Sequence, residues 1–485
     1  MIQNSFAAFD RYGNFTDLQA LKDVTAKPLR RSIRVNTLKC SVEDMLAWGK
    51  ARNWSLLPVP WCGEGFFIDR VDREEALGKD FMHLMGGFYV QESASMLPVA
   101  LLDPKPGERI LDMSAAPGSK TTQIAARMQG RGVLVANDVQ EKRIWSLLTN
   151  LQRCGVTNAC VTRKVGQWFA GHMTEVFDRV LCDAPCTAQG TARKDSDALN
   201  YCSMDNVGKM ARLQRELLES AVHACKVGGR IVYSTCTLTP EENEDVVLSI
   251  LNKFSDQLSI LNPAEILEAD FGRPLEDSAR VQSSLGRTKS EPMIRLWPQT
   301  LDTEGFFSVA IEKRAPTRDK KATKDLEPHR WTLLPNSRRK NIADRLEDWF
   351  GASFLHEGEM LFEMKEQLFM LPEDFLHFFL PVNPYMGGIP FGKNTSHGLT
   401  RLSHEMATLR GTEATKQVLR VSGDEMKSVM KGVNIPASPA GFDDGDVLFA
   451  VEAPEIGRDI VFGRGMLKAG TVLNRLPRDI VRMFA

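Results

Sequence analysis

Several features that mark particular classes of protein are missing from this sequence. No apolar run approaches the roughly 20 residues that a membrane-spanning helix requires, and the first residues, MIQNSFAAFDRYG, lack the basic-then-apolar pattern of a signal peptide. Nine cysteines occur, but no two have CxxC spacing, so a structural zinc site is not expected. These absences lead us to expect a cytoplasmic protein with reduced cysteines, no metal and no membrane partner.

An excess of charge of either sign is also missing, because the 485 residues carry a formal net charge of only −1. Any attraction to nucleic acid must therefore come from local clusters of Lys and Arg. The composition, 43% hydrophobic and 25% charged, is that of a globular chain. Because the chain is too long for one ordinary core, we expect roughly two to four domains.

From about residue 105 the sequence alternates short apolar runs with helical stretches. RILDM, GVLVAND, RVLCD and RIVYSTC each end in a polar residue, and they are separated by SKTTQIAARM, EKRIWSLLTNLQRC and MARLQRELLESAVHAC. This alternation predicts an α/β fold with a parallel sheet covered by helices on both faces. MIRLWP and FFSVAIEKR are expected to close the sheet as antiparallel edge strands. Ligands of such sheets bind beyond the carboxyl ends of the strands, where the polar strand ends fall.

The rest of the chain divides around this region. We expect an N-terminal extension over residues 1–95, a Rossmann-like domain over 96–314, a basic linker and connecting subdomain over 315–382, and a β-rich module over 383–485. The linker is marked by residues 311–340, which hold ten Lys or Arg, four Asp or Glu and three prolines. It is either a solvated connection or a segment that contacts phosphate, and the charge pattern alone does not separate the two.

A candidate cofactor site lies in RILDMSAAPGSKTTQIAARM, a pattern that predicts a strand, a tight turn and a helix. Pro117 presets its backbone angle, Gly118 lets a ligand approach, and free N–H groups at the start of the helix attract an anionic group. The next strand ends at Asp138, which is placed to bind both hydroxyls of a ribose. Because the turn lacks the glycines of a pyrophosphate cradle, a nucleoside with a carboxylate, S-adenosylmethionine, fits best. The alternative is a structural turn in which Asp138 caps a helix.

Two further segments, DRVLCDAPCTAQGT and GRIVYSTCTLTPEE, each place a cysteine after a strand. Methylation at carbon 5 of cytosine needs one thiolate, which adds at carbon 6, and a carboxyl group near N3 and the exocyclic amine. A second acid or base helps to dissolve the adduct, and the target base must leave its stack. Asp183, Cys186 and Cys236 supply this set, although buried cysteines are often inert core residues. The residues alone do not decide which thiol attacks.

LDMSAAPGSKTTQ, DAPCTAQGTARKD and GGRIVYSTCTLTPEENE resemble the three signature blocks of RNA 5-methylcytosine methyltransferases, the family that includes the Nop2/Sun proteins. The resemblance covers residues 25–313. It implies that Cys236 is the nucleophile, that Cys186 assists release of the methylated base, and that Asp183 contacts the cytosine close to the transferred methyl group. It also implies that S-adenosylmethionine is held by Asp183, Asp138 and the turn residues Ser114, Ala115, Ala116, Pro117, Gly118, Ser119 and Lys120.

The whole layout, including the long C-terminal part, is similar to a bacterial 16S ribosomal RNA methyltransferase of this family. That similarity implies a PUA-like RNA-binding module over residues 383–485, an RNA-binding N-terminal extension and a monomeric protein. It also implies a substrate, the cytosine at position 1407 in the decoding region of 16S rRNA, within the 30S subunit. The alternatives are the same chemistry on another RNA, a non-catalytic ribosome-assembly factor and, more distantly, a nicotinamide-dependent oxidoreductase.

Two positions depart from the family pattern. The acid that usually reads the adenine amine is replaced by Val165, so Gln167 or backbone groups have to substitute for it. The family usually continues DAPC with Ser-Gly-Glu-Gly, whereas residues 187–190 are Thr-Ala-Gln-Gly. Neither departure touches the two thiols or Asp183.

Three basic groups are candidate contacts for RNA phosphates. The first group lies in the N-terminal part, the second follows the DAPC block near the expected site, and the third lies in the C-terminal module. Ordinary surface charge is the alternative for each of them. Their members are Arg30, Arg31, Arg34 and Lys39, then Arg193 and Lys194, then Lys468, Arg475 and Arg478.

Overall fold

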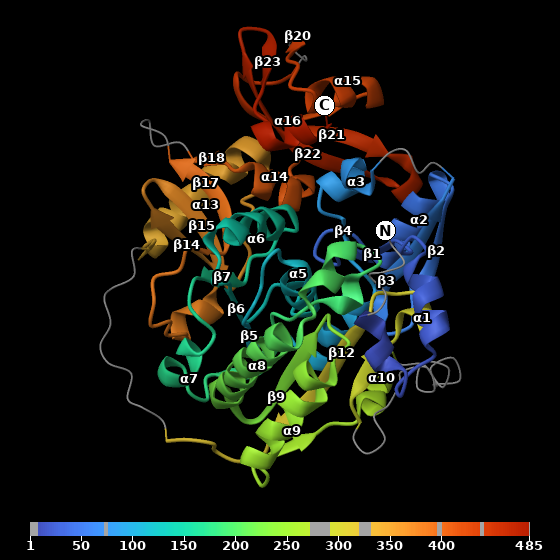
Figure 1. The fold of residues 1–485 in the computed structure, drawn as a ribbon. Coiled ribbons are helices and arrows are strands. Elements are labelled where there is room, and N and C mark those ends of the chain that lie inside the picture. The colour runs from blue at the N-terminus through green and yellow to red at the C-terminus, as the bar shows by residue number, and fades with distance from the viewer. Residues whose placement is uncertain are drawn as a thin grey trace.

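A nine-stranded sheet forms the centre of the computed structural model, which describes residues 8–71, 76–271, 292–319, 331–394, 400–436 and 441–484 (Figure 1). The sheet has the order β10-β12-β9-β8-β5-β6-β7-β16, with β11 paired to β12. Its parallel strands are β5 (Arg109–Asp112), β6 (Val133–Asn137), β7 (Ala159–Thr162), β8 (Phe177–Asp183) and β9 (Cys225–Thr235). Its antiparallel strands are β10 (Leu258–Ile260), β11 (Ile294–Leu296), β12 (Phe306–Lys313) and β16 (Met386–Gly387).

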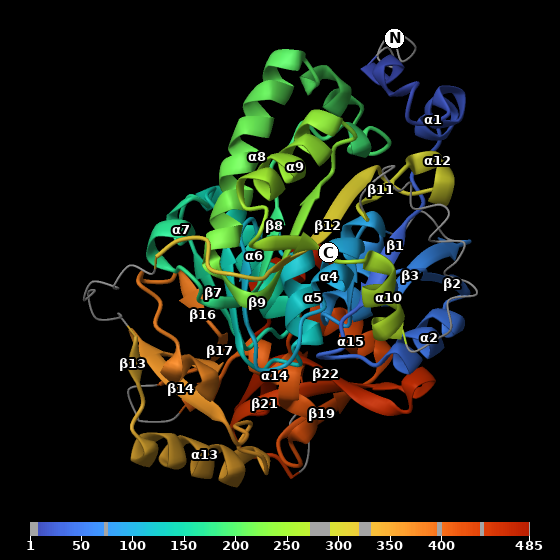
Figure 2. The ribbon, with the colours of Figure 1, turned by 90° about the horizontal axis from the view of Figure 1, so that it is seen from below.

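Helices cover both faces of this sheet, so its central strands are buried on both sides (Figure 2). One face packs against α4 (Leu97–Leu102), α5 (Ser119–Arg127), α6 (Glu141–Arg153) and α10 (Pro263–Phe271). The other packs against α7 (Trp168–His172), α8 (Met204–Ala224) and α9 (Glu244–Lys253). The expected α/β fold is therefore confirmed. The strands β11 and β12 are antiparallel as expected, but β12 is not an edge strand, because β10 and β11 pair with its outer side.

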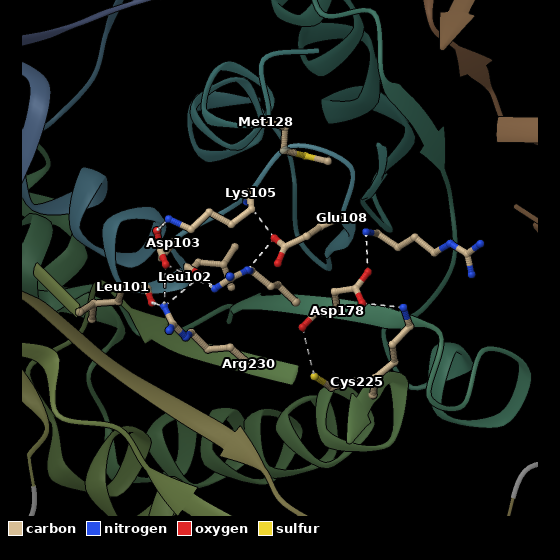
Figure 3. Close-up of polar contacts among 12 residues, drawn as sticks. Leu101, Leu102, Asp103, Lys105, Glu108, Met128, Asp178, Cys225 and Arg230 are labelled. Atoms are coloured by element: carbon tan, nitrogen blue, oxygen red, sulfur yellow. Dashed lines mark hydrogen bonds and ion pairs between the residues drawn. The ribbon is translucent and has the colours of Figure 1, made fainter. Parts of the chain in front are cut away.

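The amino-terminal ends of the parallel strands are closed by ion pairs and hydrogen bonds (Figure 3). Arg230 donates to the carbonyl of Leu101 at 3.0 Å, and Lys226 lies 2.5 Å from Asp178. Asp178 also accepts the backbone N–H of Arg109 at 2.8 Å. Because these charges are paired with one another, they are not available to a ligand. The polar groups that can bind a ligand lie at the opposite, carboxyl-terminal ends of the strands.

A four-stranded antiparallel sheet of order β2-β3-β1-β4 precedes the central sheet. This part consists of α1 (Leu18–Thr25), β1 (Ser32–Val35), α2 (Val42–Ala51), β2 (Trp54–Val59), β3 (Cys62–Arg70), α3 (Phe81–Leu84) and β4 (Phe88–Val90). Residues of α1 and the segment before it pack against the loops that follow β8 and β9. The N-terminal part therefore packs against the carboxyl-terminal ends of the strands, where the site is expected.

Two five-stranded sheets follow the central one. The first has the order β13-β14-β15-β17-β18 and crosses residue 383, the boundary expected between the connecting subdomain and the C-terminal module. Its elements are β13 (Thr332–Leu333), α13 (Asn336–Phe350), β14 (Glu359–Met364), β15 (Gln367–Pro372), β17 (Ile389–Asn394), β18 (Thr400–Leu402) and α14 (His404–Arg410). Of the basic segment 311–340, residues 320–330 lie outside the described part of the chain.

The last sheet has the order β19-β21-β22-β23-β20 and forms the C-terminal β-rich module. It consists of β19 (Val418–Val421), α15 (Gly423–Met430), β20 (Ile435–Pro436), β21 (Gly445–Ala453), β22 (Arg458–Lys468), β23 (Thr471–Asn474) and α16 (Arg478–Phe484). Its core is continuous with that of the N-terminal sheet, and Phe81 of α3 meets Phe462 of β22 with ring centroids 6.0 Å apart (Figure 1). Within the described residues, no helix combines the length and apolarity needed to cross a bilayer.

Candidate active site

Polar contacts tie together the carboxyl ends of neighbouring parallel strands. Asn137, the last residue of β6, donates from Nδ2 to the carbonyls of Met113 at 3.1 Å and Lys164 at 2.9 Å. Its Oδ1 accepts from the hydroxyl of Thr162 at 2.9 Å. On the other side, Asp183 at the end of β8 pairs in register with Ser234 of β9. These contacts fix the carboxyl ends of β5, β6 and β7 relative to one another, and that of β8 relative to β9.

The turn between β5 and α5 has the geometry expected of a ligand-binding turn. Gly118 has φ +110°, a value that favours glycine, and a Cβ there would lie 3.2 Å from the side chain of Leu147. No side chain of the described residues caps α5, which leaves its first N–H groups free to bind an anion. The N–H of Ala115 donates to the carbonyl of Asn137 at 2.7 Å, which fixes the turn beside β6.

Asp138 lies directly after β6 and is only 2% exposed. Its carboxylate accepts the N–H of Gln140 at 2.9 Å and that of Ala116 at 3.3 Å, and Arg143 lies 3.5 Å away. Arg143 also donates to the carbonyl of Ala116. Asp138 thus contacts both its own loop and the turn after β5, as a group that binds a ribose must do.

Asp112, the last residue of β5, is completely enclosed by the turn. Burial raises the pKa of this carboxyl group to about 7, although the hydroxyl of Thr121 donates to it at 2.8 Å. Asp112 therefore holds the start of α5 to the end of the strand. The sequence analysis did not single it out, although its place at the end of the first strand was a usable signal.

Lys120 and Asp183 form the central ion pair of the site, with Nζ 2.8 Å from the carboxylate. The second oxygen of Asp183 accepts from the hydroxyl of Ser234 at 2.7 Å. Burial opposes the charge on Lys120, but Asp183, and after it Asp112 and Cys236, raise the pKa of Lys120 above its ordinary value. Lys120 is therefore a buried cation of the site and not a solvated lysine of the first helical turn.

The two candidate cysteines meet at the same place. The sulfur atoms of Cys186 and Cys236 are 3.2 Å apart, within hydrogen-bond distance of each other. The hydrogen bond to Cys236 is the largest cause that raises the pKa of Cys186, and burial and the charges of Cys236 and Glu242 act in the same direction. Cys154, Cys160, Cys182 and Cys225 are buried instead, as expected of inert core cysteines.

Gly190 brings the loop of Cys186 into backbone contact with the loop of Cys236. The N–H of Gly190 donates to the carbonyl of Cys236 at 3.0 Å, and its carbonyl accepts from Gly305 at 2.9 Å. A Cβ on Gly190 would lie 2.1 Å from the carbonyl oxygen of Gly305 and 2.7 Å from that of Cys236. Only glycine fits this contact, which ties both loops to the start of β12.

Several predicted RNA contacts instead bind groups within the protein, so the prediction is wrong for them. Arg34 is 1% exposed and donates to Gln91 and Thr122, at 2.8 Å each. The side chain of Arg193 is also 1% exposed and lies 2.7 Å from Asp302. Lys39 donates to the carbonyl of Met85 and the hydroxyl of Thr408, both at 3.1 Å. Exposed candidates that remain are Arg31, Lys194, Lys468, Arg475 and Arg478.

The structure also bears on the acid that is missing at Val165 and on Gln167 as its replacement. Val165 is 55% exposed, and the amide of Gln167 donates to Glu216 on α8 at 2.9 Å. Gln167 is thus engaged on the surface of α8, and backbone groups remain as candidates to read the adenine. Asn137 and Glu242 are polar residues of the site that the sequence analysis did not single out, although Asn137 ends a predicted strand and Glu242 lies within a motif that carried the resemblance.

These groups fit S-adenosylmethionine on their chemistry. The uncapped start of α5 suits the carboxylate of the methionine part, and the buried carboxylate of Asp138 suits the two ribose hydroxyls. The close turn between them leaves no side chain bulk at Gly118. Lys120, from the same start of α5, is paired with Asp183, and the sulfur atoms of Cys186 and Cys236 lie 3.2 Å apart on the loops after β8 and β9.

Comparisons with known proteins agree with this arrangement. Residues 99–312 match the family model of 16S rRNA methyltransferase RsmB/F, and residues 11–93 match that of the N-terminal domain of 16S rRNA methyltransferase RsmF. Ribosomal RNA small subunit methyltransferase F of Aeromonas salmonicida is 37% identical over 94% of this chain and 92% of its own length. The protein of the same name from Vibrio atlanticus is 36% identical over the same shares.

Solved structures show the same fold. A methyltransferase homolog protein from Pyrococcus horikoshii is 32% identical, with a TM-score of 0.50 over 64% of this chain and 99% of that chain. NSun6 from Pyrococcus horikoshii, solved with the S-adenosylmethionine analogue SFG, is 23% identical, with a TM-score of 0.53 over 63% and 97% of the two chains. Because relatives above 30% identity match 94% of the sequence, the chain belongs to the RsmB/F family of S-adenosylmethionine-dependent 16S rRNA methyltransferases.

Proposed function

We propose that this protein methylates carbon 5 of a cytosine in 16S rRNA, at position 1407, through a covalent adduct between Cys236 and carbon 6. The observation that carries the proposal is the meeting of two thiols, 3.2 Å apart, beside the ion pair of Lys120 and Asp183. A single thiol would suit many transferases. Two thiols next to a paired carboxylate match the needs of a reaction that must both form and dissolve an adduct.

The cofactor is assigned to the turn after β5 and to the end of β6. Residues Ser114 to Lys120 form the turn that holds the methionine part, with the uncapped N–H groups at the start of α5 facing its carboxylate, and Asp138 holds the ribose. When bound, S-adenosylmethionine supplies an electrophilic methyl group. Asp183 lies between this turn and the thiols, so it contacts the cytosine close to the methyl group.

The two thiols have different surroundings, which supports different roles. Cys236 directly follows β9 and lies near the ammonium group of Lys120, and its sulfur attacks carbon 6. The carbon–sulfur bond makes carbon 5 nucleophilic. Carbon 5 then takes the methyl group as the bond between this methyl group and the cofactor sulfur breaks, with the electron pair left on that sulfur. In the last step carbon 5 loses its proton to water, the electron pair forms the C5–C6 double bond, and Cys236 leaves as a thiolate. Cys186 assists this departure by donating its S–H to the leaving sulfur.

The RNA is proposed to lie across the N-terminal part and a PUA-like C-terminal module. Lys468, Arg475 and Arg478 are exposed and form no ion pair within the described residues, which leaves them available to phosphates. We propose the assembled 30S subunit as the substrate, a monomer as the active form and the cytoplasm, where ribosomes occur, as the location. The expected divisions at residues 95 and 314 remain proposals, whereas a division at 382 does not fit the sheet that joins β15, before it, to β17, after it.

Methyl transfer to defined RNAs tests this proposal. Purified protein is mixed with methyl-labelled S-adenosylmethionine and either 30S subunits or free 16S rRNA, and the labelled nucleotide is mapped. We expect 5-methylcytosine at position 1407, with more label in 30S subunits than in free RNA. Label on a different RNA alone would contradict the substrate, and absence of label on every RNA tested would support an assembly factor without activity.

A further inference from the structure

Glu242 has a place in the site that the proposed reaction does not yet use. It is 0% exposed and ends the short 3-10 helix η6 (Pro240–Glu242), directly after the loop of Cys236. Its carboxylate accepts the N–H of Thr187 at 3.0 Å, the amide of Gln214 at 2.8 Å and the hydroxyl of Thr239 at 3.0 Å. The hydroxyl of Thr187 donates to it as well. Four donors thus converge on one buried carboxylate.

These contacts fix the residues on both sides of Cys186. Thr187, which follows it, is bound to Glu242 through its backbone and its side chain. Pro185, which precedes it, accepts the amide of Gln214 from α8 at 2.8 Å. Since Gln214 also donates to Glu242, the carboxylate joins the Cys186 loop, the Cys236 loop and α8 in one network. Buried hydrogen-bond networks of this kind hold a loop in a single conformation.

The charge of Glu242 also acts on Cys186. The hydrogen bond to Cys236 and burial raise the pKa of Cys186 most, and the carboxylate of Glu242 raises it further. A carboxylate favours the neutral S–H form of a nearby cysteine. Glu242 thus both fixes the loop of Cys186 and favours the form of this thiol that can donate to the sulfur of Cys236, 3.2 Å away.

We propose that Glu242 is a positioning residue for Cys186, which it holds in place as an S–H donor for release of the methylated base. This inference rests on the proposed function, because it assumes that Cys236 attacks and that Cys186 assists release. Glu242 touches neither the base nor the methyl group in this account. Its loss should leave the attack of Cys236 intact and slow the step in which the C6–sulfur bond breaks.

Glu242→Gln tests the inference, because it keeps the size of the side chain but removes its charge. The new amide group must also face the donors of Gln214 and Thr239. We expect the first methyl transfer to proceed, later turnovers to slow on the order of a hundredfold, and a covalent protein–RNA adduct to accumulate on denaturing gels. Glu242→Asp, which restores the carboxylate, should recover part of the turnover. A KM for RNA that stays unchanged would separate this effect from loss of binding.

Glu244→Gln is the matched control, because Glu244 lies two residues away and binds Arg295 outside this network. It should not accumulate adduct. If Glu242→Gln turns over like the wild type while Cys186→Ala accumulates adduct, the inference is wrong and the proposed function stands. If Cys186→Ala itself forms no adduct, the proposed function fails instead. Should Glu242→Gln not fold, Gln214→Met decides the question, because it removes the bond to Pro185, and lack of adduct there would overturn the inference.

Discussion

Lys120 links the turn assigned to the cofactor with the residues proposed to carry out methyl transfer. It belongs to the first turn of α5, yet its ammonium group binds Asp183 at the end of β8. We expect Lys120→Met to lower methyl transfer by about a hundredfold, because Asp183 and Cys236 lose their common cation. The rate of label transfer to 30S subunits measures this. Lys142→Met, at an exposed position of α6, is the control and should act like the wild type.

Glu304 is a residue whose titration affects stability. Burial and the nearby Glu92 raise its pKa from 4.5 to about 8, while Lys194, Lys120 and Arg193 oppose the shift. The folded protein therefore holds a proton that the unfolded chain releases between about pH 4.5 and pH 8, so this residue favours the folded state less as the pH rises through that window.

We expect Glu304→Gln to remove this contribution. The free energy of unfolding, measured with urea at several pH values, should fall less steeply for the variant than for the wild type as the pH rises from about 5 to about 8. Titrating groups away from Glu304, Asp112 among them, act in both proteins and cancel in the comparison, whereas Glu92 interacts with Glu304 and its contribution changes together with that of Glu304. Identical pH dependence of the two proteins would show that Glu304 is not protonated in the folded state.

Charged residues were the hardest to place from the sequence. Arg34 and Arg193 belong to basic stretches, and such stretches usually lie in solvent. Both are buried because carbonyl and side-chain oxygens from distant segments surround them, and no local pattern predicts that. The motif residues were easier, since Asp183, Cys186 and Cys236 follow strands whose carboxyl ends must meet.

At the scale of elements, the 3-10 helix η4 (Gln189–Thr191) can approach the start of β12 only because Gly190 has no side chain. We expect Gly190→Ala to lower the free energy of unfolding by about 1–3 kcal/mol and to reduce methyl transfer, because the new Cβ meets the carbonyls of Gly305 and Cys236. Chemical denaturation and the label assay measure the two effects.

Gly208 provides the control for this substitution. It lies in α8, and a Cβ added there would have no neighbouring atom within 4 Å, so Gly208→Ala should raise helix stability by roughly 0.5–1 kcal/mol. If the two alanine variants behaved alike, the close approach of the loops at Gly190 would not matter for either stability or activity.

The strands of the central sheet were predictable because they are buried on both faces. Short apolar runs such as VLVAN have no polar alternation, and each is followed by a helix of clear period. The N-terminal sheet was not predicted. Its strands are interrupted by polar residues that bind inside the protein, such as Arg34 in β1, so its pattern did not indicate strands.

At the scale of the whole molecule, the N-terminal sheet and the C-terminal module share one hydrophobic core. Arg458 of β22 lies 2.7 Å from Asp44 of α2, and Phe462 is 0% exposed beside Phe81. We expect Phe462→Ala to destabilise the protein by about 3–5 kcal/mol and to speed amide exchange in β1 and β3 as well as in β21. Hydrogen exchange with mass spectrometry resolves these segments.

Phe379→Ala is the matched control, because Phe379 is 50% exposed and lies outside that core. Faster exchange confined to the C-terminal module would contradict a shared core. A common core matters for function because it holds two parts, far apart in the sequence, side by side (Figure 2). Sequence alone did not indicate this, since contacts between distant segments leave no local pattern.

The most direct test of the account identifies which cysteine becomes bonded to RNA. Cys186→Ala is incubated with 30S subunits and S-adenosylmethionine, the adduct is digested, and the peptide that carries a nucleotide is sequenced by mass spectrometry. We expect a methylated cytidine on the peptide of Cys236, no adduct in the double variant Cys186→Ala/Cys236→Ala, and no turnover by Cys236→Ala. A nucleotide bonded to Cys186 in Cys236→Ala, or full activity of that variant, would contradict the central claim.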